Sequence, residues 1–152
     1  MKKIVVFTGA GVSADSGIAT FRDSDGLWAN HRIEDVCTPE ALAANRPVVI
    51  DFYNRRRREL LQKKANPAHE AIASLESKYE VEVITQNIDD LHERAGSTRI
   101  THLHGQLSKL QSMSDSSRVY DIPDWQKAVE AVESGKDVED YARVWKEEVD
   151  AK

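Results

Sequence analysis

The sequence predicts an α/β fold: a partial doubly wound parallel sheet with crossover helices, followed by an α-helical C-terminal tail. Three short apolar runs rich in β-branched residues predict the strands, at 3–8, 79–85 and 99–104. Helical segments separate these runs, which is typical of parallel strands joined by crossover helices. Two amphipathic segments, 123–134 and 138–149, predict the helical tail.

The first strand leads directly into a glycine turn. Residues 3–8 read KIVVFT, an apolar run dense in β-branched side chains, and residues 9–11 read GAG. A run of this kind followed by glycines is typical of a buried strand and a tight turn. We expect Ser13 to be the N-cap of a short helix over 13–18.

The region between the first two strands is predicted to be helical. One helix is expected to have Thr38 as its N-cap and Pro39 as its first residue, because each residue type is favoured at that position. A longer helix is expected over 47–64. Another is expected to begin at Asn66 and Pro67, for the same reason as the first.

Length and composition indicate one globular domain. The chain has 152 residues, of which 40% are hydrophobic and 31% charged. No apolar run approaches ~18 residues, so we expect no membrane partner. The single cysteine, Cys37, excludes a disulfide within the chain and a four-cysteine zinc site, and a cytoplasmic location is expected.

Acidic charge is concentrated near the C-terminus. The formal net charge is −5, and residues 121–152 carry ten acidic and five basic side chains, which account for all of it. Residues 1–120 are therefore balanced. Nothing in this distribution favours a polyanion, so we expect no nucleic-acid partner. The chain is predicted to consist of a balanced part, 1–120, and an acidic helical tail, 121–152.

The glycine turn matches a dinucleotide-binding pattern. Residues 9–14, GAGVSA, fit G-x-G-x-x-G/A directly after a predicted strand. Gly9 permits the tight turn, and Gly11 lets a pyrophosphate approach the backbone, where free N–H groups at a helix start hold the anion. The alternative is a glycine turn that binds no ligand.

Three sequence blocks together resemble one family. Residues 9–22 read GAGVSADSGIATFR, residues 85–92 read TQNIDDLH, and His104-Gly105 follows. In this order and at these distances, the blocks resemble the sirtuins, the NAD-dependent protein-lysine deacylases. The resemblance covers about residues 1–120 and implies a Rossmann-like, NAD-binding half-domain there.

The resemblance implies a role for each matched residue. It implies that NAD lies over the turn at Gly9, with its phosphates contacted by Ala10, Gly11 and Ser13. Phe21 and Arg22 would cover the nicotinamide and its ribose. Gln86, Asn87 and Asp89 would hold the nicotinamide ribose and the carboxamide, Asn87 and Asp89 as part of the catalytic set. His104 would be the general base, taking a proton from a ribose hydroxyl during transfer of the acyl group from an acylated lysine of a protein to ADP-ribose.

Several of these residues have a simpler alternative. Asn87 and Asp89 could cap a short helix over 87–95. Phe21 could be an ordinary core residue. His102 and His104 point the same way on a strand and could bind a metal ion, but no third ligand has a suitable spacing, so we expect no metal site.

A second pattern concerns the substrate. Tyr53 and Arg56 are three residues apart on the predicted helix 47–64, so they share a face. In one sirtuin class, a Tyr-x-x-Arg pair in this segment binds the acidic acyl group of succinyl- or malonyl-lysine. The planar fork of arginine suits a carboxylate. The alternative is a solvated basic helix face, because four arginines follow one another here.

The chain departs from the family after His104. Residues 106–117 contain no cysteine, whereas many sirtuins bind zinc there, and residues 106–121 read as polar loop or hairpin. The family's second half, including a Gly-Thr-Ser turn, has no counterpart. The alternative function is therefore a truncated, catalytically silent module that binds NAD or ADP-ribose. Without further strands, residues 4–8 would form an open sheet edge, which favours a homodimer or cover by the tail.

Overall fold

The chain forms two compact units in a computed structural model that describes residues 1–20, 31–112, 114–122 and 124–135. Residues 1–21 and 63–106 make up the sheet unit, and residues 22–62 and 107–152 make up the helical unit. Within the described ranges, no helix is both long enough and apolar enough to cross a bilayer. The predicted helix 138–149 lies outside the described residues, and the division into 1–120 and 121–152 stays a prediction.

The sheet unit is built on three parallel strands in the order β1-β2-β3. Its elements are β1 (Lys3–Thr8), α1 (Ala10–Ala14), α5 (Pro67–Ser74), a short 3-10 helix (Leu75–Ser77), β2 (Glu80–Thr85), α6 (Leu91–Arg94) and β3 (Ile100–His102). Val83 lies opposite Val6 on one side and Ile100 on the other. The predicted α/β fold with parallel strands and crossover helices is confirmed.

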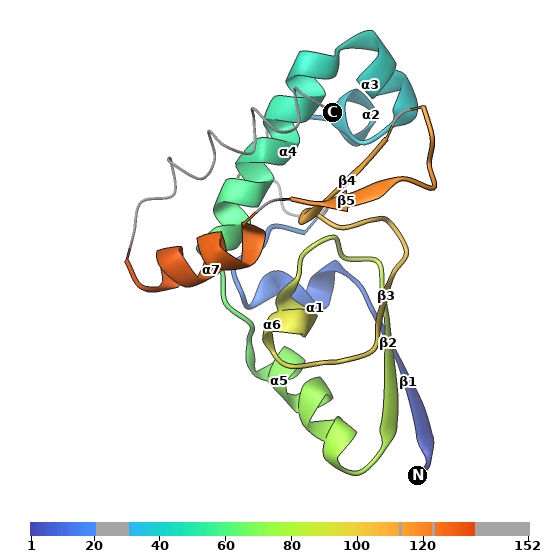
Figure 1. Cartoon of the computed structure of the whole chain (residues 1–152), viewed down its shortest axis with the longest axis vertical. Coiled ribbons are helices and arrows are strands. Elements are labelled where there is room, and N and C mark those ends of the chain that lie inside the picture. The colour runs from blue at the N-terminus through green and yellow to red at the C-terminus, as the bar shows by residue number, and fades with distance from the viewer. Residues whose placement is uncertain (21–30, 113, 123, 136–152) are drawn as a thin grey trace. The chain divides into compact units, whose positions relative to one another are not determined.

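The two faces of this sheet differ. Val81, Val83 and Thr85 of β2 are buried, and Figure 1 shows α5 and α6 on the same side of the strands. Side chains alternate between the faces of a strand, so the residues between these three point to the opposite face. On that opposite face, Val5 and Phe7 of β1 are 56% and 62% exposed.

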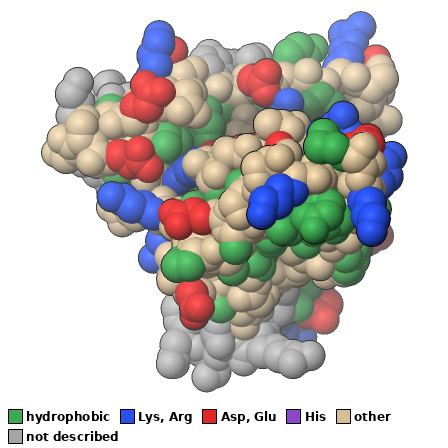
Figure 2. Space-filling view, turned by 90° about the horizontal axis from the view of Figure 1, so that it is seen from below, with side chains coloured by type: hydrophobic (Ala, Val, Ile, Leu, Met, Phe, Trp, Pro, Cys, Tyr) green, Lys and Arg blue, Asp and Glu red, His purple; other side chains and the backbone are tan. Residues whose placement is uncertain are grey.

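Strand β1 is an edge strand in the described part of the chain, because β2 is its one partner there. Figure 2 shows a face of the molecule where hydrophobic side chains gather between lysine and arginine side chains. An edge strand with exposed apolar side chains, as Val5 and Phe7 are in β1, favours pairing with another strand. The homodimer through this edge stays a prediction, for which the exposure of Val5 and Phe7 is the support.

Helix starts were predicted with mixed success. The prediction for Ser13 is wrong: α1 begins at Ala10 with Gly9 as its N-cap, and Ser13 lies inside the helix with its side chain buried. The start at Asn66 is confirmed. Its side chain accepts a hydrogen bond from the Ala68 N–H at 2.9 Å, and its own N–H donates to Nδ1 of His69 at 3.2 Å.

The helical unit contains four helices and a hairpin among its described residues. They are α2 (Ile33–Val36), α3 (Pro39–Ala44), α4 (Arg46–Leu61), β4 (Lys109–Gln111), β5 (Val119–Asp121) and α7 (Trp125–Glu133). Thr38 caps α3 as predicted, because its side chain accepts from the Ala41 N–H at 3.1 Å. Antiparallel pairing of β4 with β5 confirms the predicted hairpin.

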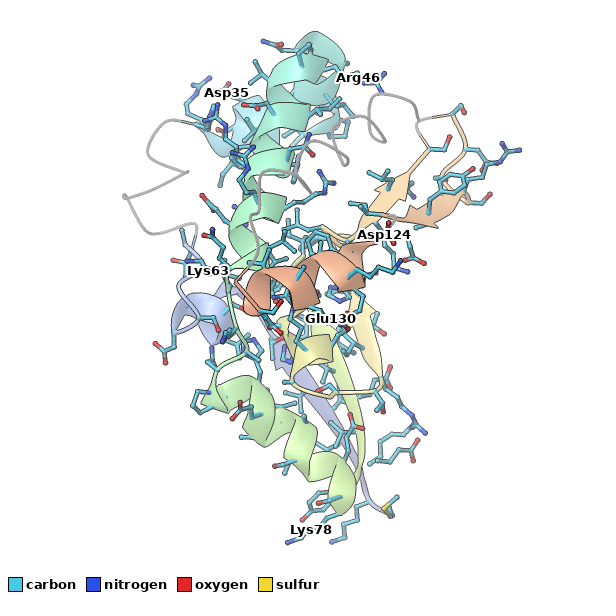
Figure 3. The ribbon with its side chains drawn as sticks, turned by 60° about the vertical axis from the view of Figure 1, so that its left-hand side comes forward. Asp35, Arg46, Lys63, Lys78, Asp124 and Glu130 are labelled. Atoms are coloured by element: carbon cyan, nitrogen blue, oxygen red, sulfur yellow. The ribbon has the colours of Figure 1, made fainter. Side chains whose placement is uncertain are left out.

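Helices α4 and α7 form the core of the helical unit. Phe52 and Leu61 of α4 are almost fully buried, and so are Ala128 and Val129 of α7, which packs against α4. Figure 3 marks α7 by Asp124 and Glu130, whose acidic side chains belong to the predicted tail. The long helix expected over 47–64 is confirmed, although α4 begins one residue earlier and ends three residues earlier than predicted, at Leu61.

Candidate active site

The glycine turn lies where β1 ends. Gly9 is the N-cap of α1, and its carbonyl accepts the Val12 N–H at 3.1 Å. Apart from its two neighbours and the backbone of its own helix, no described atom lies within 4 Å of the position that a Cβ on Gly11 would take. Ala10 and Gly11 are the first residues of α1, so their N–H groups have no acceptor within the helix. The turn therefore presents open backbone and unpaired donors, which suits an anion.

The hydroxyl of Ser13 is the centre of a buried hydrogen-bond network. Ser13 is 1% exposed, and its Oγ donates to Oδ2 of Asp89 at 2.9 Å. Nδ2 of Asn87 donates to the same Oγ at 3.2 Å. Nδ1 of His69 accepts the Asn66 N–H, so its Nε2, 3.3 Å from Oγ, carries the proton and donates. Three hydrogen bonds thus saturate this hydroxyl.

Asn87 is held by its backbone and its side chain. Its N–H donates to Oγ1 of Thr85 at 3.0 Å, and its carbonyl lies 2.7 Å from Nδ1 of His102. Besides Ser13, its Nδ2 donates to the carbonyl of Gly9 at 3.0 Å. Its Oδ1 makes no hydrogen bond with any described residue, so a fixed side chain offers one acceptor for a ligand hydroxyl.

Asp89 is buried beneath this site with both carboxylate oxygens bound. Oδ2 accepts from Ser13, and Oδ1 accepts from the Leu91 N–H at 3.1 Å. Burial raises the pKa of Asp89 above its usual value, although these two hydrogen bonds act against the rise. The N-cap of α6 is Asp90 and not Asn87 or Asp89, although the bond from Asp89 to Leu91 ties Asp89 to the first residue of that helix. Asp89 therefore positions Ser13 and the start of α6.

His104 follows the end of β3 at the same edge of the sheet. Its side chain is exposed and makes no hydrogen bond within the described ranges. Gln86 is also exposed, and its Oε1 lies 3.4 Å from the position of a Cβ on Gly9. Phe21 and Arg22 lie outside the described residues. All of the other residues implied for the cofactor thus lie in the sheet unit, where parallel strands end.

Comparison with known proteins identifies the family. The family model described as the Sir2 family matches residues 9–149. The chain belongs to the Sir2 family. This match confirms the resemblance to sirtuins. The Sir2 chain is 60% identical over 116 residues to an NAD-dependent protein deacylase of Aggregatibacter actinomycetemcomitans, and the match covers 76% of this chain and 56% of that protein. A Helicobacter pylori protein with the same description is 51% identical over 137 residues, covering 90% and 58%.

Solved structures give the same family and fold. A Sir2 homologue in complex with NAD matches this Sir2 chain with a TM-score of 0.72 and 43% identity, covering 80% of this chain and 47% of that one. A structure titled "Structural Basis for the Mechanism and Regulation of Sir2 Enzymes" matches with a TM-score of 0.66 and 43% identity, covering 89% and 52%. The Rossmann-like fold is thus confirmed, and this Sir2 chain spans about half the length of the relatives it matches.

Tyr53 and Arg56 lie on α4 of the helical unit. Burial raises the pKa of the Tyr53 phenol, and a hydrogen bond with Cys37 raises it further, whereas Arg56 and Arg57 lower it. The Arg56 guanidinium lies 5.7 Å from the centre of the Phe52 ring. The charge of Arg56 therefore acts on the pKa of the phenol, as expected for side chains three residues apart on one helix.

The sequence did not reveal the hydrogen-bonding roles of three residues of the Sir2 chain. His69 was signalled only by its place three residues after the Asn66 cap, a position that reaches back to the cap. His102 was weighed as a metal ligand, whereas it contacts Asn87 and Glu93. Arg57 is buried and donates to the Leu107 carbonyl at 2.7 Å and to Oδ1 of Asn54 at 3.0 Å. No local pattern in the sequence predicts a contact such as that of Arg57 with Leu107, 50 residues away.

A second buried chain of hydrogen bonds runs beside Ser13. Thr8 donates from Oγ1 to Oγ1 of Thr85 at 2.8 Å, so Nε2 of His92, 3.0 Å from the Thr8 oxygen, must donate to it. Burial lowers the pKa of His92 to about 4, with the neighbouring His69 as the next cause. The two imidazole rings meet edge to face at 4.9 Å. Both histidines are therefore held neutral, and His92 is a buried hydrogen-bond donor.

Acid is expected to destabilise the Sir2 chain through these histidines. In the unfolded chain His92 takes up a proton near its ordinary pKa of 6.5, whereas in the folded chain it does so only near 4. Stability is therefore lost as the pH falls from about 6.5 to about 4, by about 3 kcal/mol from His92 at most. Burial also lowers the pKa of His69, which adds to the loss, whereas the raised pKa of Asp89 opposes it.

Urea denaturation at several pH values between 7 and 4.5 measures this loss. His92→Gln should flatten the pH dependence, whereas His31→Gln, which removes a histidine of the helical unit, should retain it. An unchanged dependence in His92→Gln would show that His92 is not the group responsible.

Proposed function

We propose that this chain is an NAD-dependent protein-lysine deacylase that transfers the acyl group from acylated lysine side chains of proteins to ADP-ribose. Its relatives are described as NAD-dependent protein deacylases. The observation that carries the proposal is the fixed Asn87, whose Oδ1 has no partner among the described residues, at the sheet edge that also bears Gly11 and His104. The proposal includes residues 1–120 as the NAD-binding half-domain, 121–152 as an acidic helical tail, and a cytoplasmic location.

The residues present fit NAD. The open backbone at Gly11 and the N–H groups of Ala10 and Gly11 suit the pyrophosphate. Oδ1 of Asn87 and the exposed side chain of Gln86 are available to ribose hydroxyls and the carboxamide. When bound, NAD supplies the ribose carbon that receives the acyl oxygen and the nicotinamide that leaves.

The residues of the chain then have separate tasks. Ser13, held by His69 and Asp89, fixes the side chain of Asn87 so that Oδ1 keeps its orientation when a ligand arrives. The imidazole of His104 is exposed and takes the proton from the ribose hydroxyl. A preorganised acceptor and an accessible base are what group transfer at a ribose requires.

The proposal is tested by incubating the full chain with NAD and an acyl-lysine peptide and measuring nicotinamide release and peptide mass. Release that depends on both NAD and peptide is the expected result. Calorimetry with ADP-ribose measures binding separately. Binding without release would favour the catalytically silent binding module, and neither binding nor release would overturn both functions.

We further infer that the acyl group is acidic, of the succinyl or malonyl kind. The support is the placement of Tyr53 and Arg56 three residues apart on α4, where the charge of Arg56 lowers the pKa of the phenol. The phenol can donate one hydrogen bond to a carboxylate, and the guanidinium can donate two in parallel.

Succinyl-lysine is expected to be turned over faster than acetyl-lysine, and Arg56→Met is expected to erase most of the difference. A charge-assisted hydrogen bond contributes roughly 1.5–3 kcal/mol, which is about ten- to a hundredfold in kcat/KM. The comparison of kcat/KM for the two peptides measures it. A wild-type preference for acetyl-lysine would contradict the inference.

Arg55→Met is the matched control. Arg55 is exposed and pairs with Asp51 at 2.8 Å on the same helix, so its replacement should leave the acyl preference unchanged. Arg57 is unsuitable, because its guanidinium is buried and bonded to Leu107 and Asn54. Equal losses in Arg55→Met and Arg56→Met would indicate a diffuse basic field rather than a specific pair.

A further inference from the structure

His102 joins the end of β3 to the loop that carries Asn87. Its Nδ1 lies 2.7 Å from the carbonyl oxygen of Asn87, and its Nε2 lies 2.7 Å from Oε1 of Glu93 on α6. The side chain of His102 is 6% exposed. Residues 86–90 lie in neither a helix nor a strand, so side-chain contacts of this kind determine where Asn87 lies.

Both oxygen partners of His102 are acceptors. A carbonyl oxygen has no proton, and neither has an ionised carboxylate. Two hydrogen bonds of 2.7 Å therefore require a proton on each ring nitrogen, which is the imidazolium form. Burial lowers the pKa of His102, but its hydrogen bonds to Glu93 and Asn87, with the charges of Glu93 and Asp89, outweigh burial and raise the pKa above its usual value.

We propose that His102, as an imidazolium paired with Glu93, is a positioning residue that holds the main chain of Asn87 and thereby the orientation of its Oδ1. The effect on NAD rests on the proposed function, whereas the hold on Asn87 is a property of the free chain. His102 precedes His104 by two residues, so one short segment both supplies the exposed imidazole and fixes the loop of Asn87.

The hold on Asn87 depends on pH. The ionisable groups that face His102 are Glu93 and His92 on α6 and Asp89 on the loop. His92, with a pKa of about 4, stays neutral while His102 titrates. As the pH rises through the pKa of His102, the ring keeps one proton and donates it to the charged partner, because that hydrogen bond is the stronger one. The lone pair of Nδ1 then faces the carbonyl of Asn87, and this contact becomes repulsive.

Nuclear magnetic resonance of the free chain tests the hold directly. The ring of His102 and the backbone amides of Asn87 and Ile88 should titrate together, with a midpoint above pH 6.5, the ordinary pKa of histidine. Glu93→Gln preserves shape and removes the counter-ion, so the common midpoint should fall by roughly 1–3 pH units. Glu80→Gln removes a carboxylate from the surface of β2 and should leave the midpoint unchanged. The proposal would be overturned if the amide shifts of Asn87 and Ile88 did not change as His102 titrates. It would also be overturned if Glu93→Gln left the midpoint of His102 unchanged.

Calorimetry with NAD at pH 6 to 9 tests the consequence. The Kd should rise roughly tenfold across the midpoint in the wild type and in Glu80→Gln, the loss expected for one charge-assisted hydrogen bond. His102→Phe should bind weakly at every pH, with no pH dependence in this range. A Kd that is equal at pH 6 and 9, while ring and amides titrate together, would overturn the claim that the hold on the main chain of Asn87 sets the orientation of its Oδ1. Absence of NAD binding at every pH, with ring and amides still titrating together, overturns the proposed function and supports the hold on Asn87.

Discussion

Replacing His104 with Ala is expected to lower deacylation by roughly 10²–10⁴-fold, the usual effect of losing a general base. The side chain is exposed and has no hydrogen-bond partner among the described residues, so its removal costs neither packing nor a hydrogen bond. The free energy of unfolding should therefore stay within about 0.5 kcal/mol of the wild type. Binding of ADP-ribose should survive, because Gly11, Ser13 and Asn87 are untouched.

The measurements are nicotinamide release, ADP-ribose affinity by calorimetry and urea denaturation, made on one preparation. Thr101→Ala is the matched control, since Thr101 is an exposed residue of β3, the strand that precedes His104, and takes no part in the site. Full activity in His104→Ala would remove His104 from the mechanism. Loss of binding together with activity would mean that His104 holds the ligand instead of acting on it.

The strands and the glycine turn could be predicted because their signals are local. The run at Lys3–Thr8 is apolar and β-branched, and the glycines follow at once. The capping function at Asn66 is local too, since its partners lie two and three residues away. The prediction that Ser13 caps a helix failed for a physical reason. Serine favours the N-cap position, but Ser13 lies inside α1, where its hydroxyl donates to Asp89, 76 residues away in the sequence.

The site was predictable only where a motif carried it. The blocks containing Gly11, Asn87 and His104 could be matched by their order and spacing. The supporting residues could not, because His69 reaches Ser13 across 56 residues and the role of His102 depends on Glu93 in a helix that only the fold brings near. Spacing identifies what touches a ligand, whereas packing determines what holds those residues in place.

Ser13→Ala is expected to lower the free energy of unfolding by roughly 2–4 kcal/mol, because it leaves two buried groups without their partner. Oδ2 of Asp89 loses its donor and Nε2 of His69 loses its acceptor, whereas Nδ2 of Asn87 retains the carbonyl of Gly9. One of the two orphaned groups is a carboxylate, and burial makes its desolvation costly.

Urea denaturation at pH 7 measures the loss, with Ser77→Ala as the control. Ser77 is exposed and its hydroxyl bonds only to the carbonyl of Ser74 in its own turn, so its loss should stay below about 0.5 kcal/mol. A cycle with Asp89→Asn tests the specific bond: if Ser13 acts through Asp89, the double variant should lose less than the sum of the single losses, by roughly 0.5–3 kcal/mol. A loss in Ser13→Ala as small as that in Ser77→Ala would mean that water replaces the hydroxyl, and Ser13 would then no longer be the centre of the network.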